Sequence, residues 1–277
     1  MSAQQITPEL RQWIIAQAEA GHSPESVLTA MQASGWEEAV ALDAMEEVLH
    51  ERASALGVAP KPMPGVPATG GNRVWAHDRE VTLQVQVQHP RLAVLGDFLS
   101  PEECEQLQEL ARPRLNRSET VVNATGGSEV NAARTSQGMF FNRGENELCA
   151  RIEARIAALL QWPVENGEGI QILRYAPGAE YRPHFDYFDP SQPGTPSILQ
   201  RGGQRVGTLV MYLNTPAEGG ATTFPDAGVT VHAQAGSAVF FAYPLPGPQT
   251  KTLHGGAPGT EGEKWVATKW LREGRFT

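Results

Sequence analysis

This chain has very little cysteine and no long apolar run. Its 277 residues include two cysteines, Cys104 and Cys149. Two thiols build neither a disulfide framework nor a zinc cluster, so we expect both to be reduced and to lie in helices. No apolar segment approaches the roughly 18 residues that a membrane-spanning helix needs. The first residues lack the basic start and apolar core of a signal peptide. We therefore expect a cytoplasmic protein without a membrane partner.

Positive charge is also scarce. The chain has 22 Lys and Arg against 31 Asp and Glu, a formal net charge of -9. A nucleic-acid partner usually requires a basic face, so this balance argues against one. Hydrophobic residues nevertheless make up 40% of the chain and charged residues 19%, which excludes a disordered protein. The 28 glycines and 21 prolines favour strands and turns over long helices.

The negative charge is concentrated at the N-terminus, where residues 1–54 contribute -7 of the -9. This segment predicts an acidic module of three short helices, two of which begin at Thr7-Pro8 and Ser23-Pro24. Its apolar positions are Leu10, Trp13, Ile14, Ala18, Val27, Leu28, Met31, Ala41, Met45, Val48 and Leu49. With Gly35-Trp36 in a turn, the module resembles a ubiquitin-associated-like domain. It is either a docking site for a protein partner or a packing appendage.

A linker rich in proline and glycine follows at 55–73, and residues 74–277 form the second module. Alternation predicts a strand at 81–88, and the capping box at Ser100 starts a helix ending near Ala111. A second amphipathic helix is expected at 147–160. Short strands separated by turns then dominate, at 170–175, 181–187, 205–214, 229–233, 237–243 and 264–271. Helices followed by many strands predict an α+β domain built on a β-sandwich or barrel.

The strongest chemical signal is His184-Phe185-Asp186. Residues i and i+2 of a strand share one face, so the imidazole and the carboxylate should project side by side. A third ligand would complete a two-histidine, one-carboxylate set, which binds ferrous iron and leaves positions open for oxygen and a chelating cosubstrate. His232 and His254 both lie downstream.

His254 lies before a Gly-Gly pair, and such small residues permit close backbone approach to a metal site. Lys264 follows ten residues later, and a hairpin of that length would return it beside His254. A buried ammonium needs an anionic partner, which a dicarboxylate cosubstrate would supply.

Residues 90–274 resemble the prolyl 4-hydroxylase family of iron(II)- and 2-oxoglutarate-dependent dioxygenases. The segments that carry the resemblance are RTSQGMF at 134–140, LRY at 173–175 followed by Gly178, YRPHFD at 181–186, MYLN at 211–214, EGGATTFP at 218–225, LHGG at 253–256 and KW at 264–265. The resemblance implies a double-stranded β-helix, a jelly-roll-like barrel with flanking helices, preceded here by the small all-α module.

The resemblance also implies roles for individual residues. His184, Asp186 and His254 correspond to the Fe(II) ligands, and Lys264 to the residue that pairs with the distal carboxylate of 2-oxoglutarate. Tyr175 corresponds to a tyrosine that reaches the same carboxylate, and Thr208 is expected to assist there. The substrate-groove positions are Arg134, Ser136, Glu168, Tyr181, Arg205 and Trp270. His232 falls outside the family motif, so we treat it as structural. Arg272 is a departure, because some family members have His there.

The function implied is 4-hydroxylation of a prolyl residue in a peptide or protein, with O2 as oxidant, succinate and CO2 as co-products, and ascorbate as reductant. Two alternatives stay open. The substrate could be a free amino acid, a small metabolite or another protein side chain. The protein could instead be a non-catalytic, metal-binding adaptor. The polar segment 188–204 is expected to act as a lid over the site, against the alternative of a passive surface loop.

Overall fold

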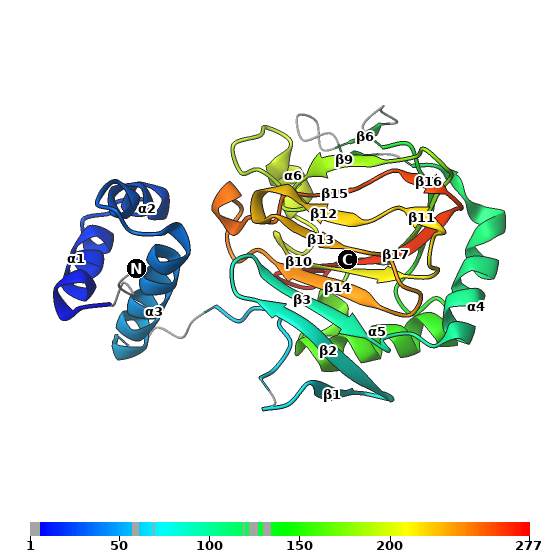
Figure 1. Ribbon diagram of the computed structural model, residues 1–277, viewed down its shortest axis with the longest axis horizontal. Coiled ribbons are helices and arrows are strands. Elements are labelled where there is room, and N and C mark those ends of the chain that lie inside the picture. Colours follow the sequence, from blue (N-terminus) through cyan, green and yellow to red (C-terminus); the bar gives the residue numbers. More distant parts are fainter. Residues whose placement is uncertain (1–5, 57–60, 69, 119, 122–126, 130–133) are drawn as a thin grey trace. The chain divides into compact units, whose positions relative to one another are not determined.

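Two compact units, Met1–Pro62 and Met63–Thr277, make up the chain in the computed structural model (Figure 1). The structure describes residues 6–56, 61–68, 70–118, 120–121, 127–129 and 134–277. The division falls inside the predicted linker, of which residues 57–60 and 69 lie outside the described residues.

The first unit contains the three predicted helices, α1 (Pro8–Glu19), α2 (Pro24–Ala33) and α3 (Glu38–Ala55). Thr7 and Ser23 cap α1 and α2, accepting from backbone N–H groups at 3.3 and 3.2 Å, and a proline follows each cap. The buried core consists of Ile14, Val27, Leu28, Met31, Ala41, Ala44, Met45 and Val48. The prediction was wrong for Trp13, which is 36% exposed, and for Ala18, which is also exposed, because Ile14 takes the inward position of α1.

The end of the predicted linker belongs to the second unit. Met63 and Val66 pack against its core, and the Gly65 N–H donates to the carbonyl of Leu160 at 3.0 Å. These contacts begin eleven residues before the predicted domain start at 74, because apolar side chains within a Pro/Gly-rich stretch still gain free energy by burial.

Deletion at two points tests this boundary. Removing residues 1–62 should leave the melting temperature of the second unit unchanged, because all packing contacts within that unit, from Met63 onward, are kept. Removing residues 1–70 also takes away Met63 and Val66, at a cost of roughly 1–3 kcal/mol. That loss should lower the melting temperature by several degrees in a calorimetric scan. Equal melting temperatures for the two truncations would contradict the assignment of 63–68 to the second unit.

The second unit is built on two facing sheets (Figure 1). Among the described residues the larger sheet has nine strands, in the order β1-β2-β3-β14-β10-β17-β8-β7-β4. Their bounds are β1 Arg73–Ala76, β2 Arg79–Val87, β3 Arg91–Gly96, β4 Asn116–Arg117, β7 Gln137–Phe141, β8 Ile170–Tyr175, β10 Arg205–Tyr212, β14 Ala238–Ala242 and β17 Lys264–Arg272.

The smaller sheet has the order β13-β12-β15-β9 and lies over the larger one. Its strands are β9 (Tyr181–His184), β12 (Thr222–Phe224), β13 (Val229–Val231) and β15 (His254–Gly256). Two short pairs complete the strands, β5 (Thr120–Val121) with β6 (Ser128–Glu129) and β11 (Glu218–Gly219) with β16 (Gly259–Glu261).

Helices α4 (Pro101–Ala111) and α5 (Glu147–Leu160) match their predicted ranges, and the capping box at Ser100 is formed. A short helix, α6 (Thr195–Leu199), lies in the segment predicted as a lid. Single 3-10 turns occur at Arg112–Arg114, Val164–Asn166, Pro225–Ala227 and Pro248–Thr250.

The central strands β10 and β17 are buried along their whole length. Because side chains alternate, each strand serves two cores. Val210, Tyr212 and Val266 face the barrel interior, whereas Met211 and Ala267 belong to the core that contains α4 and α5. This arrangement confirms the predicted α+β barrel with flanking helices. It also fixes which residues of β8, β10 and β17 reach the interior.

Several strands are shorter than predicted, and the important case is β9, which ends at His184 instead of continuing to 187. β9 lies at an edge of the smaller sheet. Tyr181 forms an isolated bridge with Arg134, but the ladder of β9 is made with the three-residue strand β15, so it stops where β15 begins. Asp186 therefore follows the strand. The strand predicted at 229–233 likewise ends at Val231, which leaves His232 exposed and away from the site.

Candidate active site

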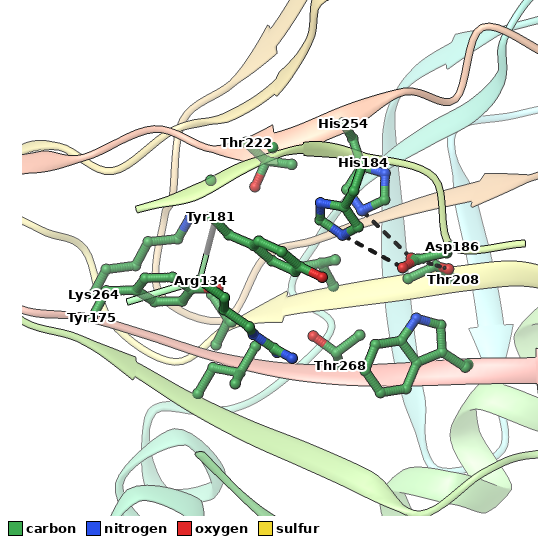
Figure 2. A pocket seen from close by; sticks show the side chains of 16 residues that line it. Arg134, Tyr175, Tyr181, His184, Asp186, Thr208, Thr222, His254, Lys264 and Thr268 are labelled. Atoms are coloured by element: carbon green, nitrogen blue, oxygen red, sulfur yellow. Dashed lines mark hydrogen bonds and ion pairs between the residues drawn. The ribbon is translucent and has the colours of Figure 1, made fainter. Parts of the chain in front are cut away.

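Two histidines from strands far apart in the sequence lie side by side. His254 on β15 and His184 on β9 are directly opposite each other in the antiparallel register. Asp186 lies between their imidazoles, with its Oδ1 3.6 Å from Nε2 of His184 and its Oδ2 3.4 Å from Nε2 of His254 (Figure 2). The potential ligand atoms of the three residues all lie within 4.8 Å of one another.

Backbone carbonyls orient both imidazoles. Nδ1 of His184 lies 2.9 Å from the carbonyl of Arg182, and Nδ1 of His254 lies 2.9 Å from that of Thr252. A carbonyl only accepts, so each Nδ1 carries the proton and each Nε2 presents a lone pair to the centre. Two imidazole nitrogens and one carboxylate form a donor set suited to Fe(II), with coordination positions left for other ligands.

The electrostatics keep Asp186 and His254 in their metal-binding forms. Burial would raise the pKa of Asp186, but electrostatic interaction with His254, hydrogen bonding with His184 and the positive charge of Arg205 hold it well below its usual range. Burial lowers the pKa of His254 to about 4. The carboxylate is therefore ionised and the His254 imidazole is neutral near pH 7, as metal ligation requires.

Gly255 lets the two histidine strands approach. A Cβ at this position would lie 2.9 Å from the Tyr181 carbonyl oxygen and 3.1 Å from the Pro183 nitrogen. No other residue fits between β15 and β9 without moving the backbone, which accounts for the glycine directly after His254.

The other end of the same pocket holds Lys264 and Tyr175, which are opposite each other on β17 and β8 (Figure 2). The Lys264 ammonium lies 5.4 Å from the centre of the Tyr175 ring. Burial lowers the pKa of Lys264 to about 8. Among the described residues no carboxylate forms an ion pair with it, so the pocket offers a nearly buried cation to an anionic ligand.

The structure brings Lys264 to the site by a different route from the predicted hairpin. His254 belongs to the smaller sheet and Lys264 to the larger one, while β16 between them pairs with β11. The lysine therefore faces the histidines across the barrel interior.

Thr208 is not beside Lys264. It is opposite Trp270 on β17, six residues along that strand from Lys264. Six residues of strand span about 20 Å. Its hydroxyl donates instead to Oδ2 of Asp186 at 2.8 Å. The expectation that Thr208 assists in holding the distal carboxylate was therefore wrong.

Some lining residues had no predicted role. Thr222 lies in the segment EGGATTFP at 218–225 and accepts a hydrogen bond from the Tyr212 hydroxyl at 2.8 Å. Thr268 lies on the same face of β17 as Lys264 and Trp270. The period-two pattern of β17 could have identified Thr268, since i, i+2, i+4 and i+6 share a face.

The predicted groove residues divide into two groups. Arg134, Tyr181 and Trp270 line the pocket. The Tyr181 ring stacks on His184 with centroids 3.6 Å apart, and the Arg134 guanidinium lies 4.7 Å from the Tyr181 ring centre. Ser136 is not among the residues that line the pocket. It is fully buried, and its hydroxyl donates to that of Ser118.

Glu168 and Arg205 form a buried ion network instead of a groove surface. Both carboxylate oxygens of Glu168 accept from Arg205, at 2.7 and 3.0 Å, and one also accepts from Arg272 at 2.7 Å. Arg205 also stacks on Trp270, with its guanidinium carbon 4.1 Å from the ring centre. Glu168 does not line the pocket, and both of its carboxylate oxygens already accept from arginines, so the structure does not support its predicted contact with a substrate. Arg272, the departure from the family pattern, completes this network.

Replacing Glu168 with Gln should destabilise the protein strongly. The variant leaves two buried guanidinium groups without their carboxylate, and breaking a buried pair costs about 3–5 kcal/mol. Urea unfolding should show this loss in the free energy of unfolding. Glu218, which is exposed, provides the matched control, and Glu218→Gln should unfold like the wild type. A Glu168→Gln variant as stable as the control would contradict the structural role.

Gln204 joins the two ends of the segment 188–204 by hydrogen bonds to Phe188. The amide of this side chain accepts from the Phe188 N–H at 2.8 Å and donates to the Phe188 carbonyl at 2.7 Å. Phe188 itself is buried and lies against Arg205. The ends of the segment are thus fixed beside Asp186, and its action as a lid stays a prediction.

Both cysteines are buried, Cys104 in α4 and Cys149 in α5, as predicted. Burial raises the pKa of each thiol to about 11, so neither is a reactive thiolate near neutral pH. No helix in the described ranges has the length and hydropathy to cross a membrane.

Comparison with known proteins agrees with this geometry. The family model of the 2OG-Fe(II) oxygenase superfamily matches residues 170–272. Prolyl 4-hydroxylase 1 of Arabidopsis thaliana is 43% identical over 224 residues, which are 72% of this chain and 77% of that protein. Probable prolyl 4-hydroxylase 3 of the same plant is 38% identical, over 68% of this chain and 71% of its own.

Among solved structures, a viral collagen prolyl hydroxylase from Paramecium Bursaria Chlorella virus-1, in a 2OG complex, superposes with a TM-score of 0.50. It is 28% identical, and the superposition covers 65% of this chain and 95% of that one.

Proposed function

Because this chain belongs to the prolyl 4-hydroxylase family of 2OG-Fe(II) oxygenases, we propose that it hydroxylates prolyl residues of a peptide or protein at the 4-position. The reaction consumes 2-oxoglutarate and O2 and yields succinate and CO2. One observation carries the proposal. A single pocket has a two-histidine, one-carboxylate set at one end and a nearly buried ammonium at the other.

In this proposal His184, Asp186 and His254 hold Fe(II). Their donor set, the ionised carboxylate and the oriented imidazoles all fit that ion. Bound iron supplies the activation of O2 and the oxidative decarboxylation of 2-oxoglutarate. The protein's contribution is to position the reactants and to exclude water from the site.

Lys264 binds the distal carboxylate of 2-oxoglutarate in this proposal, and Tyr175 orients it. Support comes from the burial of both side chains and from their pairing across β17 and β8. An anion there would compensate a charge that burial alone disfavours. The cosubstrate would thereby be fixed at one end while its other end lies toward the histidines.

Arg134, Tyr181 and Trp270 lie around the same pocket and are proposed to contact the substrate chain. Aromatic faces suit a proline ring, and the stack of Tyr181 on His184 would keep such a ring beside the metal ligands. Arg205 acts indirectly in this proposal, because its stacking on Trp270 fixes the indole.

We propose in addition that the N-terminal unit binds a protein partner. Its acidic character and the partly exposed Trp13 support a docking role. The use of ascorbate as reductant and a cytoplasmic location stay predictions.

The decisive experiment measures succinate from the anaerobically iron-loaded protein after addition of 2-oxoglutarate and O2, with and without a proline-rich peptide. Peptide-stimulated succinate with a one-oxygen mass gain on proline is the expected result. Succinate without peptide modification would contradict the prolyl substrate and favour a free amino acid, a metabolite or another side chain. Absence of succinate despite bound iron would favour the metal-binding adaptor.

A further inference from the structure

Asp186 differs from the two histidines in how it is held. His184 and His254 lie in paired strands and have their Nδ1 atoms fixed by carbonyls. Asp186 follows the end of β9, where no strand within the described ranges pairs with the backbone. The carboxylate therefore needs another support if its oxygens are to stay between the imidazoles.

That support comes from the larger sheet. Thr208, in the middle of β10, is fully buried, and its hydroxyl lies 2.8 Å from Oδ2 of Asp186. The same hydroxyl lies 2.8 Å from the hydroxyl of Tyr243. Tyr243 directly follows β14, is 1% exposed, and donates its backbone N–H to the Val206 carbonyl at 3.1 Å. Both hydroxyls are thus carried by rigid, buried backbone.

The direction of these hydrogen bonds follows from proton counting. An ionised carboxylate only accepts, so Thr208 gives its single hydroxyl proton to Asp186. Its oxygen can then only accept from Tyr243, and the phenol must be the donor. Donation from Tyr243 to the Thr208 oxygen polarises the Thr208 hydroxyl. The hydrogen bond from Thr208 to Asp186 is thereby strengthened in this buried site.

We infer that Tyr243 is a positioning residue for the metal site, acting through Thr208 on the carboxylate of Asp186. This inference rests on the proposed function, since it assigns a role toward the same metal. Tyr243 is not among the residues that line the pocket, so its effect on the metal site passes through Thr208. It holds the donor that fixes the rotation of the Asp186 carboxylate, so it should govern metal affinity and ligand geometry. Loss of an outer partner of this kind typically weakens metal binding by about 10- to 100-fold.

The test measures the dissociation constant of Mn(II) alone, without cosubstrate, for a set of near-isosteric variants. Tyr243→Phe and Thr208→Val should each bind Mn(II) at least about tenfold more weakly than the wild type. Thr208→Ser, which keeps the hydroxyl, should bind like the wild type. The visible spectrum of the Co(II)-loaded protein should shift in Tyr243→Phe and Thr208→Val alike.

The double variant Tyr243→Phe/Thr208→Val distinguishes a role of Tyr243 in positioning Asp186 from a role in packing alone. If Tyr243 acts through the Thr208 hydroxyl, Tyr243→Phe should have no further effect on Mn(II) binding in a Thr208→Val background. Additive losses, or a Tyr243→Phe variant that binds like the wild type, would overturn the inference while leaving the proposed function intact. A wild-type protein that binds no Mn(II) would instead contradict the proposed metal site itself. Thermal unfolding of each variant confirms that the comparison is made between folded proteins.

Discussion

Asp186→Ala should abolish the turnover of 2-oxoglutarate. The substitution removes the only carboxylate of the His–Asp–His set and leaves two imidazoles, which bind Fe(II) weakly. Loss of a residue that only hydrogen-bonds to a metal ligand costs about 10- to 100-fold in metal affinity or activity. Loss of a ligand itself should therefore cost more than about 100-fold. Succinate formation at saturating 2-oxoglutarate and a metal titration should fall together.

The fold of Asp186→Ala should persist, because its carboxylate interacts with the two histidines and with Thr208 at the end of the pocket. Asp226→Ala is the matched control, since this exposed aspartate lies in the 3-10 turn after β12 and outside the pocket. An Asp186→Ala variant that consumes 2-oxoglutarate at the wild-type rate would refute the ligand assignment.

Lys264→Met should raise the KM for 2-oxoglutarate by about 100-fold. The variant keeps the apolar length of the side chain but removes the charge that pairs with the distal carboxylate. Loss of one partner of a buried ion pair costs roughly 3 kcal/mol or more, and each 1.4 kcal/mol is about tenfold in affinity. Succinate formation as a function of 2-oxoglutarate concentration measures the effect.

The cosubstrate itself provides the control. 2-Oxopentanoate has the same chain length but lacks the distal carboxylate, so wild type and Lys264→Met should use it equally poorly. A variant that retains the wild-type preference for 2-oxoglutarate over 2-oxopentanoate would contradict the role of Lys264.

The same lysine should make cosubstrate binding pH-dependent. Burial lowers the pKa of Lys264 in the free protein to about 8, and a bound carboxylate would raise it again. Affinity for 2-oxoglutarate should therefore be complete below about pH 7 and fall as the pH rises through 8, by up to about tenfold per pH unit. In Lys264→Met this dependence should disappear, whereas a dependence that persists unchanged would assign it to another group.

Much of the molecule follows from the sequence alone. The helix caps at Thr7, Ser23 and Ser100 are local signals, and all three begin helices where predicted. The barrel fold and the candidate cluster of His184, Asp186 and His254 were inferred from motif residues, which are recognised by their identity and spacing in the sequence. Each of these inferences depends on residues close together in the chain or on a family pattern.

What the sequence could not determine depends on contacts between distant segments. The register that places His254 opposite His184 is set by pairing between β15 and β9, seventy residues apart. Glu168 and Thr208 were predicted as groove and cosubstrate residues. In the structure Glu168 accepts from Arg205 and Arg272, and Thr208 donates to Asp186. Buried charges and hydroxyls need hydrogen-bond partners, and they take those that the packing places nearby. Only the tertiary structure decides which partner is within reach, since sheet register and strand ends fix those distances.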